Sequence, residues 1–457
     1  MRRAVLVVAL LLAGCAVQPD FKRPEIELPA AWPGGAGAPQ ARGWSLYGDP
    51  QLERLIEEAL AANSDLARAV ARVDEARALL AQAEAARMPS AGAQFERSRA
   101  LSSAATGTLP PGVARERNNY RAALEVSYEL DLWGRLAAAS QAARAELLAS
   151  EAARDAVRLA LAAEVAKTWF ALRALDAQVA ATRGALALRE QGLALQRRRF
   201  EGGLISEFEL RQLEAEAAAA RAQLPALERE REASEAALAV LLGRSPRAIL
   251  EDRIARAAAP EALVAPVAPA GLPSELLLRR PDLVEAESRL AAANARVALA
   301  RSAYFPSVQL TGALGSESAA LANLFSGPAG IWRFAAAVSA PIFSGGRLEA
   351  QVDAAAARER QALAAYQSAI RNAFAEVRTA LAAQARAAET FAAESERAAA
   401  LAAALRLARL RYANGVASQL EVIDAERGLL AAEIARHEAL RAQRAALADL
   451  YRALGGW

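Results

Sequence analysis

The sequence contains one cysteine and one histidine among 457 residues, and aromatic residues make up only 5% of it. One cysteine excludes an internal disulfide, and one histidine with one cysteine cannot supply the usual ligands of a zinc site. The phosphate-binding motif GxxxxGK[ST] is also missing. His437 lies in a charged helical run, where packing or solvation explains it better than catalysis. We therefore expect no enzyme, no catalytic residue, no cofactor and no metal.

The sequence has no large excess of either charge. Its formal net charge is +3, and the basic residues, nearly all arginine, alternate with aspartate and glutamate along helical runs. This pattern lacks the clustered basic surface of a protein that binds nucleic acid, so we expect no such partner. The abundance of alanine, leucine, arginine and glutamate instead predicts long helices and coiled coils.

The N-terminus has the pattern of an export signal. Met1-Arg2-Arg3 is a positive region, residues 4–12 are apolar, and small residues follow. Leu12-Ala13-Gly14-Cys15 resembles a bacterial lipobox, which implies that residues 1–14 are removed and that Cys15 carries a lipid thioether and an acyl chain such as palmitate. Ala16 after the cysteine is typical of an outer-membrane lipoprotein. An ordinary signal peptide with an incidental cysteine is the alternative.

The rest of the chain is organised as two copies of one unit. A segment rich in proline and glycine follows Cys15 and predicts an extended, lipidated arm with Trp32 and Trp44 as anchors. A second Pro- and Ala-rich stretch separates the copies and predicts a linker, or equatorial segment. The predicted divisions are the arm at 15–47, repeat 1 at 48–242, the linker at 243–275 and repeat 2 at 276–457.

Each copy contains a helical hairpin whose tip is marked by glycine. The tips are predicted at about 200–206 and 412–418, between long helical runs. A glycine stands where a helix needs a left-handed C-terminal residue, and a serine three positions later can cap the next helix. The tip residues are Phe200, Gly202, Gly203, Leu204 and Ser206 in the first copy, and Asn414, Gly415, Val416 and Ser418 in the second.

The helix that opens each copy carries a coiled-coil seam. Small or branched apolar residues recur at alternating steps of three and four, which is the heptad pattern. The seam residues are Leu66, Ala69, Val73, Ala76, Leu80 and Ala83, and in the second copy Leu283, Ala286, Leu290, Ala293, Val297 and Ala300.

After Pro89 and Pro306 the period changes from helical to two, which predicts strands. The four predicted strands have one apolar and one polar face, and lie at about 91–99, 120–129, 307–315 and 332–341. A barrel in lipid must be closed and needs about eight strands or more, so several chains would have to pool their strands. The alternative is a soluble α+β protein with an exposed sheet edge.

Nearly the whole mature chain resembles the outer-membrane factor family of bacterial tripartite efflux pumps, the TolC/OprM-like ducts, in their lipoprotein branch. The resemblance implies an α+β membrane protein with an internal two-fold repeat. It also implies a homotrimer, whose 12-stranded outer-membrane β-barrel continues as a long α-helical coiled-coil tunnel through the periplasm. It rests on Leu12 to Cys15, Trp44, Tyr47 to Pro50, Asn63 to Leu66, Leu241 to Pro246, Arg279 to Leu283, Phe305-Pro306, Tyr412, Gly415 and Asp424-Ala425.

The function implied by this resemblance is a passive outer-membrane exit duct, which passes drugs and other toxic small molecules from a pump to the exterior. Its implied partners are a periplasmic adaptor, which docks at the hairpin tips, and an inner-membrane pump of the proton-driven RND type, with lipid of the outer membrane around the barrel. A periplasmic coiled-coil scaffold or adaptor lipoprotein is the alternative, but it would leave the four alternating strands without a purpose.

The resemblance also assigns residues to a periplasmic aperture. Glu421 and Asp424 align with the acidic residues that ring the closed aperture, and their spacing puts both on one face of a helix. The first copy has Glu209 at the place of Glu421, but Gln212 at the place of Asp424. Tyr412 aligns with an aromatic residue that ties the inner hairpin to its neighbours. Two solvated acids on an exposed helix are the alternative reading of the acidic pair.

Overall fold

The computed structural model describes residues 23–24, 27–29, 43–106, 112–256 and 276–456. The predicted signal peptide, Cys15, Trp32 and residues 257–275 of the linker lie outside these ranges. The chain divides into two compact units. One contains Arg72–Glu151 and Glu285–Gln367, with residues 23–24, and the other contains the described residues of Ile26–Ala71, Ala152–Val284 and Ser368–Trp457.

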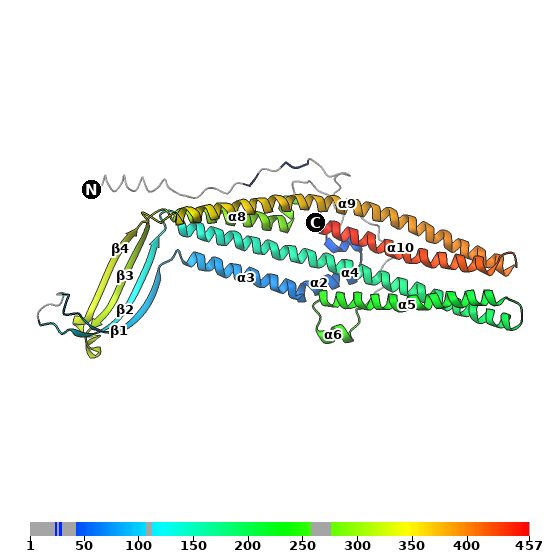
Figure 1. The fold of residues 1–457 in the computed structure, drawn as a ribbon, viewed down its shortest axis with the longest axis horizontal. Helices are drawn as coiled ribbons and strands as arrows, with labels where there is room; N and C mark the ends of the chain where they lie inside the picture. The colour runs from blue at the N-terminus through cyan, green and yellow to red at the C-terminus, as the bar shows by residue number, and fades with distance from the viewer. Residues whose placement is uncertain (1–22, 25–26, 30–42, 107–111, 257–275, 457) are drawn as a thin grey trace. The chain divides into compact units, whose positions relative to one another are not determined.

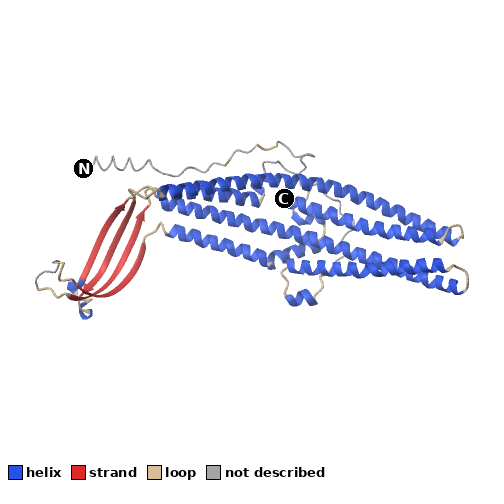
Figure 2. Ribbon diagram, in the orientation of Figure 1, coloured by secondary structure: helices blue, strands red, loops and turns tan. Residues whose placement is uncertain are grey.

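The first unit contains an antiparallel sheet of four strands, paired in sequence order (Figure 2). Its strands are β1 (Ser90–Leu101), β2 (Glu116–Leu130), β3 (Ser307–Ser318) and β4 (Gly330–Ser339). β2 begins before the predicted residue 120 because its polar start pairs with β1, which alternation of side chains does not reveal. β4 ends before the predicted residue 341, where Pro341 has no N–H for a ladder.

The register of the sheet gathers apolar side chains on one face. Leu124 lies opposite Leu314, which lies opposite Trp332 on the next strand. Trp332 and the neighbouring Phe334 are 73% and 79% exposed. Apolar surface this continuous requires a cover other than the chain's own core.

Close approach of the strands explains a glycine of the sheet. A Cβ on Gly315 would lie 2.2 Å from the carbonyl oxygen of Ala122 on β2. At Gly312, by contrast, the neighbour is a side chain. A Cβ there would lie 3.3 Å from the ring of Phe334, which fills the space above the backbone. These two glycines therefore let β3 pack against its neighbours on both sides.

The helices repeat in length as well as in order (Figure 1). The opening helices, α3 and α8, each have 22 residues, the helices after the strands, α4 and α9, each have 67, and the return helices, α5 and α10, each have 35. Their bounds are α3 (Ser64–Ala85), α4 (Arg135–Glu201), α5 (Glu207–Leu241), α8 (Pro281–Ser302), α9 (Arg347–Ala413) and α10 (Gln419–Ala453).

Shorter helices complete the described chain. They are η1 (Gly43–Tyr47), α2 (Pro50–Ala62), α6 (Pro246–Glu251), α7 (Leu276–Arg279), η3 (Leu321–Asn323) and η4 (Gly327–Ala329). α6 lies within the predicted linker, and η1 lies at the end of the predicted arm.

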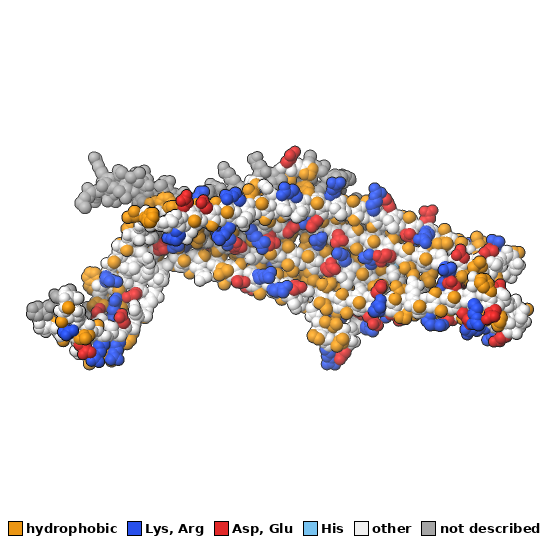
Figure 3. Space-filling model, viewed as in Figure 1, with side chains coloured by type: hydrophobic (Ala, Val, Ile, Leu, Met, Phe, Trp, Pro, Cys, Tyr) orange, Lys and Arg blue, Asp and Glu red, His pale blue; other side chains and the backbone are white. Residues whose placement is uncertain are grey.

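Most of the predicted coiled-coil seam is buried, and its other residues, Leu80, Ala83, Ala286 and Ala300, are half-buried. Leu66, Ala69, Val73 and Ala76 of α3 are all buried, as are Leu283, Leu290, Ala293 and Val297 of α8. Polar contacts flank this seam in the first unit: Arg144 of α4 pairs with Glu84 of α3 at 3.0 Å. Figure 3 shows both signs of charge interspersed along the visible face of the helices. Apolar contact along the seam thus holds the helices, while their outer faces remain hydrophilic.

Aromatic residues concentrate in the core of the second unit. The hydroxyl of Tyr47 donates to the backbone oxygen of Arg444 at 2.9 Å, and the indole N–H of Trp169 donates to Asp49 at 2.8 Å. Asp49 also caps α2 by accepting from backbone N–H groups. Trp44, a predicted anchor of the arm, packs on Tyr451 with 4.5 Å between ring centroids. η1 and α2 are therefore fastened to α4 and α10.

A buried carboxylate fastens the start of the linker to the helices. Glu235 of α5 accepts from the N–H of buried Ile254 at 2.8 Å, from Arg256 at 2.7 and 2.9 Å and from Arg253 at 3.1 Å. Arg256 also bonds Asp176 of α4 at 3.0 Å. Burial raises the pKa of Glu235, but the hydrogen bonds and the positive charge of Arg256 outweigh it and leave a pKa of about 2.

We predict that Glu235→Gln destabilises the protein at neutral pH, on the order of 2 kcal/mol once screening at exposed Arg253 is allowed for. Because the folded pKa of about 2 lies below the ordinary 4.5, the stability is present above pH 4.5 and is lost as the pH falls toward 2. Urea unfolding at pH 7 and pH 3 should therefore show a difference between wild type and variant that shrinks at pH 3. Glu251→Gln, in an exposed pair with Arg247, is the control with little effect. A pH-independent loss in Glu235→Gln would contradict the assignment.

Candidate functional site

The two hairpin tips have the same backbone construction. Gly203 and Gly415 adopt the left-handed conformation, with φ of 69° and 71°. Behind them, the N–H of Leu204 donates to the oxygen of Arg199 at 2.8 Å, and the N–H of Val416 donates to that of Arg411 at 2.9 Å. These bonds close the ends of α4 and α9. A β-branched residue at either glycine would strain the turn.

Capping boxes begin the return helices. The Ser206 hydroxyl accepts from the N–H of Glu209, whose carboxylate accepts in turn from the N–H of Ser206. Ser418 and Glu421 make the same reciprocal pair at the start of α10. Glu209 and Glu421 therefore share a structural role at the N-termini of their helices, whatever else Glu421 does.

Large apolar side chains are exposed at both tips. Leu204 and Phe208 of the first tip are 77% and 70% exposed, and Val416 and Leu420 stand exposed at the equivalent places of the second. Leu204 and Val416 are among the predicted tip residues, whereas Phe208 and Leu420 were not predicted. The sequence feature that could have identified Phe208 and Leu420 is their position: each is a large apolar residue in the first turn of a helix, outside the set of apolar residues that face the core.

Tyr412 links the two hairpins. Its hydroxyl accepts from the side-chain amide of Gln196 at 2.9 Å and from the guanidinium of Arg199 at 3.2 Å, and both donors lie on α4. A small apolar cluster lies nearby, in which Ile423 of α10 packs with Leu193 of α4 and Leu213 of α5. Within one chain, Tyr412 thus bonds α4, and its predicted role at the aperture, as a tie between the inner hairpin and its neighbours, stays a prediction. Gln196 and Arg199 were not predicted, because no periodic pattern marks them.

The acidic pair lies on the exposed side of α10. Val422 and Ile423 between the two acids are buried, whereas Glu421 and Asp424 are exposed. Glu421 lies 3.5 Å from Arg411, across the turn. Within the described ranges, Asp424 has no ion pair or side-chain hydrogen bond. Asp424 therefore retains an uncompensated negative charge near the tip.

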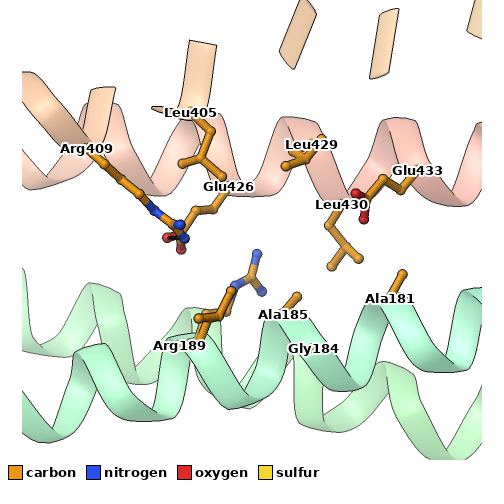
Figure 4. Close-up of a pocket in the computed structure, with 11 residues that line it drawn as sticks. Ala181, Gly184, Ala185, Arg189, Leu405, Arg409, Glu426, Leu429, Leu430 and Glu433 are labelled. Atoms are coloured by element: carbon orange, nitrogen blue, oxygen red, sulfur yellow. Dashed lines mark hydrogen bonds and ion pairs between the residues drawn. The ribbon is translucent and has the colours of Figure 1, made fainter. Parts of the chain in front are cut away.

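A groove lies between the two hairpins, farther from the tips (Figure 4). Its volume is about 270 Å³. α4 contributes the small residues Ala181, Gly184 and Ala185, while α9 and α10 contribute Leu405, Leu429 and Leu430.

Charged side chains lie at the edges of this groove. Arg409 of α9 pairs with Glu426 of α10 at 2.8 Å, and Arg189 of α4 donates to the backbone oxygen of Glu216 at 3.0 Å. These contacts join one helix to another, and none of them pairs a nucleophile with a base.

Among the described residues, no group of His, Cys, Asp or Glu side chains could hold a metal ion. No helix of the described chain is both long and apolar enough to cross a membrane.

The chain matches a protein-family model described as outer membrane efflux protein over residues 55–244 and 272–456. It is 35% identical to outer membrane protein OprJ of Pseudomonas aeruginosa, over 99% of this chain and 95% of OprJ. It is 34% identical to cation efflux system protein CusC of Escherichia coli K12, over 98% of each chain. The crystal structure of the CmeC outer membrane channel of Campylobacter jejuni superposes with a TM-score of 0.90 at 25% identity, covering 97% of this chain and 95% of CmeC.

We predict that Tyr412→Phe loosens the hairpins near their tips. The variant keeps the ring but removes the acceptor for Gln196 and Arg199, so the free energy of local opening should fall by about 1 kcal/mol. Hydrogen exchange followed by mass spectrometry should then be roughly fivefold faster in peptides covering 193–203 and 408–416. Tyr304→Phe is the matched control, because the described structure shows no hydrogen bond to the Tyr304 hydroxyl. Equal exchange in the two variants would refute the link.

Proposed function

This chain belongs to the outer membrane efflux protein family, and we propose that it conducts small toxic molecules passively through an aperture controlled by Glu421 and Asp424. Its role as outer-membrane exit duct of a tripartite efflux system follows from the family. Its fold class is that of the family: three chains with four strands each form one outer-membrane barrel, continued by a helical tunnel. The periplasmic scaffold considered from the sequence does not fit this full-length match.

The observation that supports the aperture is the difference between the two tips. Both return helices begin with a capping glutamate, Glu209 or Glu421, but the second adds an uncompensated acid, Asp424, where the first has Gln212. In a trimer, three copies of the acidic pair would form a ring of negative charge. Such a ring favours cations and repels anions at a constriction. Glu209 would add charge around the same aperture.

We place the contact with a periplasmic adaptor at the tips. The exposed apolar residues Leu204, Phe208, Val416 and Leu420 offer an anchor for apolar side chains of a partner, since such exposure is costly without one. The tip turns that present them depend on Gly203 and Gly415. The energy for transport would come from an inner-membrane pump, because no nucleotide-binding motif is present in this sequence. We propose a proton-driven pump of the RND type, which the family resemblance favours.

Planar-bilayer measurements would test the aperture. We expect wild-type channels to prefer cations, and Glu421→Gln combined with Asp424→Asn to lose most of this preference, because the ring of carboxylates is neutralised. The matched control is Asp65→Asn with Asp74→Asn, which removes two exposed acids of α3. A cation preference that the Glu421/Asp424 double variant leaves unchanged would exclude these residues from the narrowest point.

We further propose that Cys15 is lipidated, so that the mature protein is held to the outer membrane by acyl chains as well as by its barrel. The supporting observation is the run Leu12-Ala13-Gly14-Cys15 after an apolar segment. Mass spectrometry of the mature N-terminal peptide should show a diacylglyceryl group and one amide-linked acyl chain on Cys15. A peptide that begins elsewhere and is unmodified would refute this. With Cys15→Ser and a conventional signal, the protein should still insert, because the barrel has the larger apolar surface.

A further inference from the structure

A second cavity in the same unit is lined by positive charge. It lies between α4, α9 and α10, has a volume of about 140 Å³ and is separate in its residues from the groove of Figure 4. Arg173 of α4 and Arg436, Arg441 and Arg444 of α10 line it, together with His437. None of the lining residues is acidic. Four guanidinium groups thus converge on a space that holds no carboxylate.

Partners within the described chain compensate only part of this charge. Arg441 pairs with Glu438, at 2.9 Å from its Nε. Arg436 forms no ion pair or side-chain hydrogen bond with any described residue. The carboxylate of Asp49 acts on Arg444 at longer range, but its oxygens already accept from Gln51, Leu52 and Trp169. Arg436 therefore brings an uncompensated positive charge to the cavity.

Arg444 lies at this cavity with part of its guanidinium group buried. Its guanidinium lies over the ring of Phe170, 5.3 Å from the centroid, and its Nε is buried without a hydrogen-bond partner. A buried donor that bonds nothing is costly, more so on a charged group. Burial lowers the pKa of Arg444, and the charge of Arg173 lowers it further, while Asp49 opposes this. An anion in the cavity would reduce the repulsion between the guanidinium groups of Arg173 and Arg444.

The walls of the cavity are apolar. Phe170 of α4 and Phe391 of α9 line it, with Leu440 of α10. An engineered cavity of about 150 Å³ binds benzene, so a ring of that size fits the available volume. Carboxylates suit arginine because they accept two parallel hydrogen bonds from one guanidinium.

We propose that this cavity binds a small organic carboxylate, with its charged group on Arg436 and Arg444 and its apolar group against Phe170 and Phe391. The bound anion holds the two hairpins together, because it lies between Arg173 on α4 and the arginines of α10. This site goes beyond the exit duct and its aperture, since the binding requires neither transport nor the acids at the tips.

Equilibrium dialysis of radiolabelled benzoate against the purified, detergent-solubilised trimer tests the proposal at low ionic strength. Wild type should bind benzoate saturably and should unfold at a higher temperature with it. Benzyl alcohol, which has the ring without the charge, should not displace it. Arg436→Gln should weaken binding about tenfold, the effect of losing one hydrogen bond to a charged group. Arg436→Lys, which keeps the charge, should lose less.

Arg406→Gln is the matched control, since it removes an exposed arginine of α9 that does not line the cavity. Gel filtration and bilayer conductance of each variant show that the trimer and the duct are intact, which separates this test from that of the aperture. The proposal is overturned if wild type shows no saturable binding, if benzyl alcohol competes equally, or if Arg406→Gln weakens binding as much as Arg436→Gln.

Discussion

The assembly of this protein is determined by the two edges of its sheet, whose backbone groups are unpaired in a single chain. β1 and β4 each pair on one side only, so two rows of backbone N–H and C=O groups are left over in a single chain. In lipid each such group costs several kcal/mol, and the exposed apolar face of the sheet requires lipid. The barrel therefore closes only when three chains pair their edges.

The long helices follow from the same duplication that produced the strands. Equal helix lengths and capping boxes in both copies show one unit used twice. Two of the residues proposed to act at the aperture are found where the two copies differ. Tyr412 has a hydroxyl that its counterpart Phe200 lacks, and Asp424 has a charge that Gln212 lacks. The hydroxyl ties the hairpins together, and the charge faces outward from α10.

Polar contacts supplement the apolar contacts that join the two hairpins near their tips. Near the tips the apolar cluster around Ile423 is small, and hydrogen bonds at Tyr412 and ion pairs such as Arg427–Glu216 supplement it. Exposed ion pairs contribute little each, so such contacts can exchange without a large loss of stability. In the middle of the same helices, the convergence of arginines is instead unfavourable by itself, and an anion would remove that cost.

The sequence by itself determined the features that depend on local periodicity. Heptads located the buried seams from Leu66 and Leu283, alternation located the strands, and a glycine followed by a capping serine located both tips. What depends on contacts between distant residues was decided by the tertiary structure alone. Gln196 meets Tyr412, Ile254 meets Glu235, and Arg173 meets Arg444 only because the helices pack, and β2 reaches Glu116 only because β1 lies beside it. The residues next to a side chain in the sequence do not identify such partners. The period of a helix or strand indicates which face is buried, but it does not indicate which residues that face contacts.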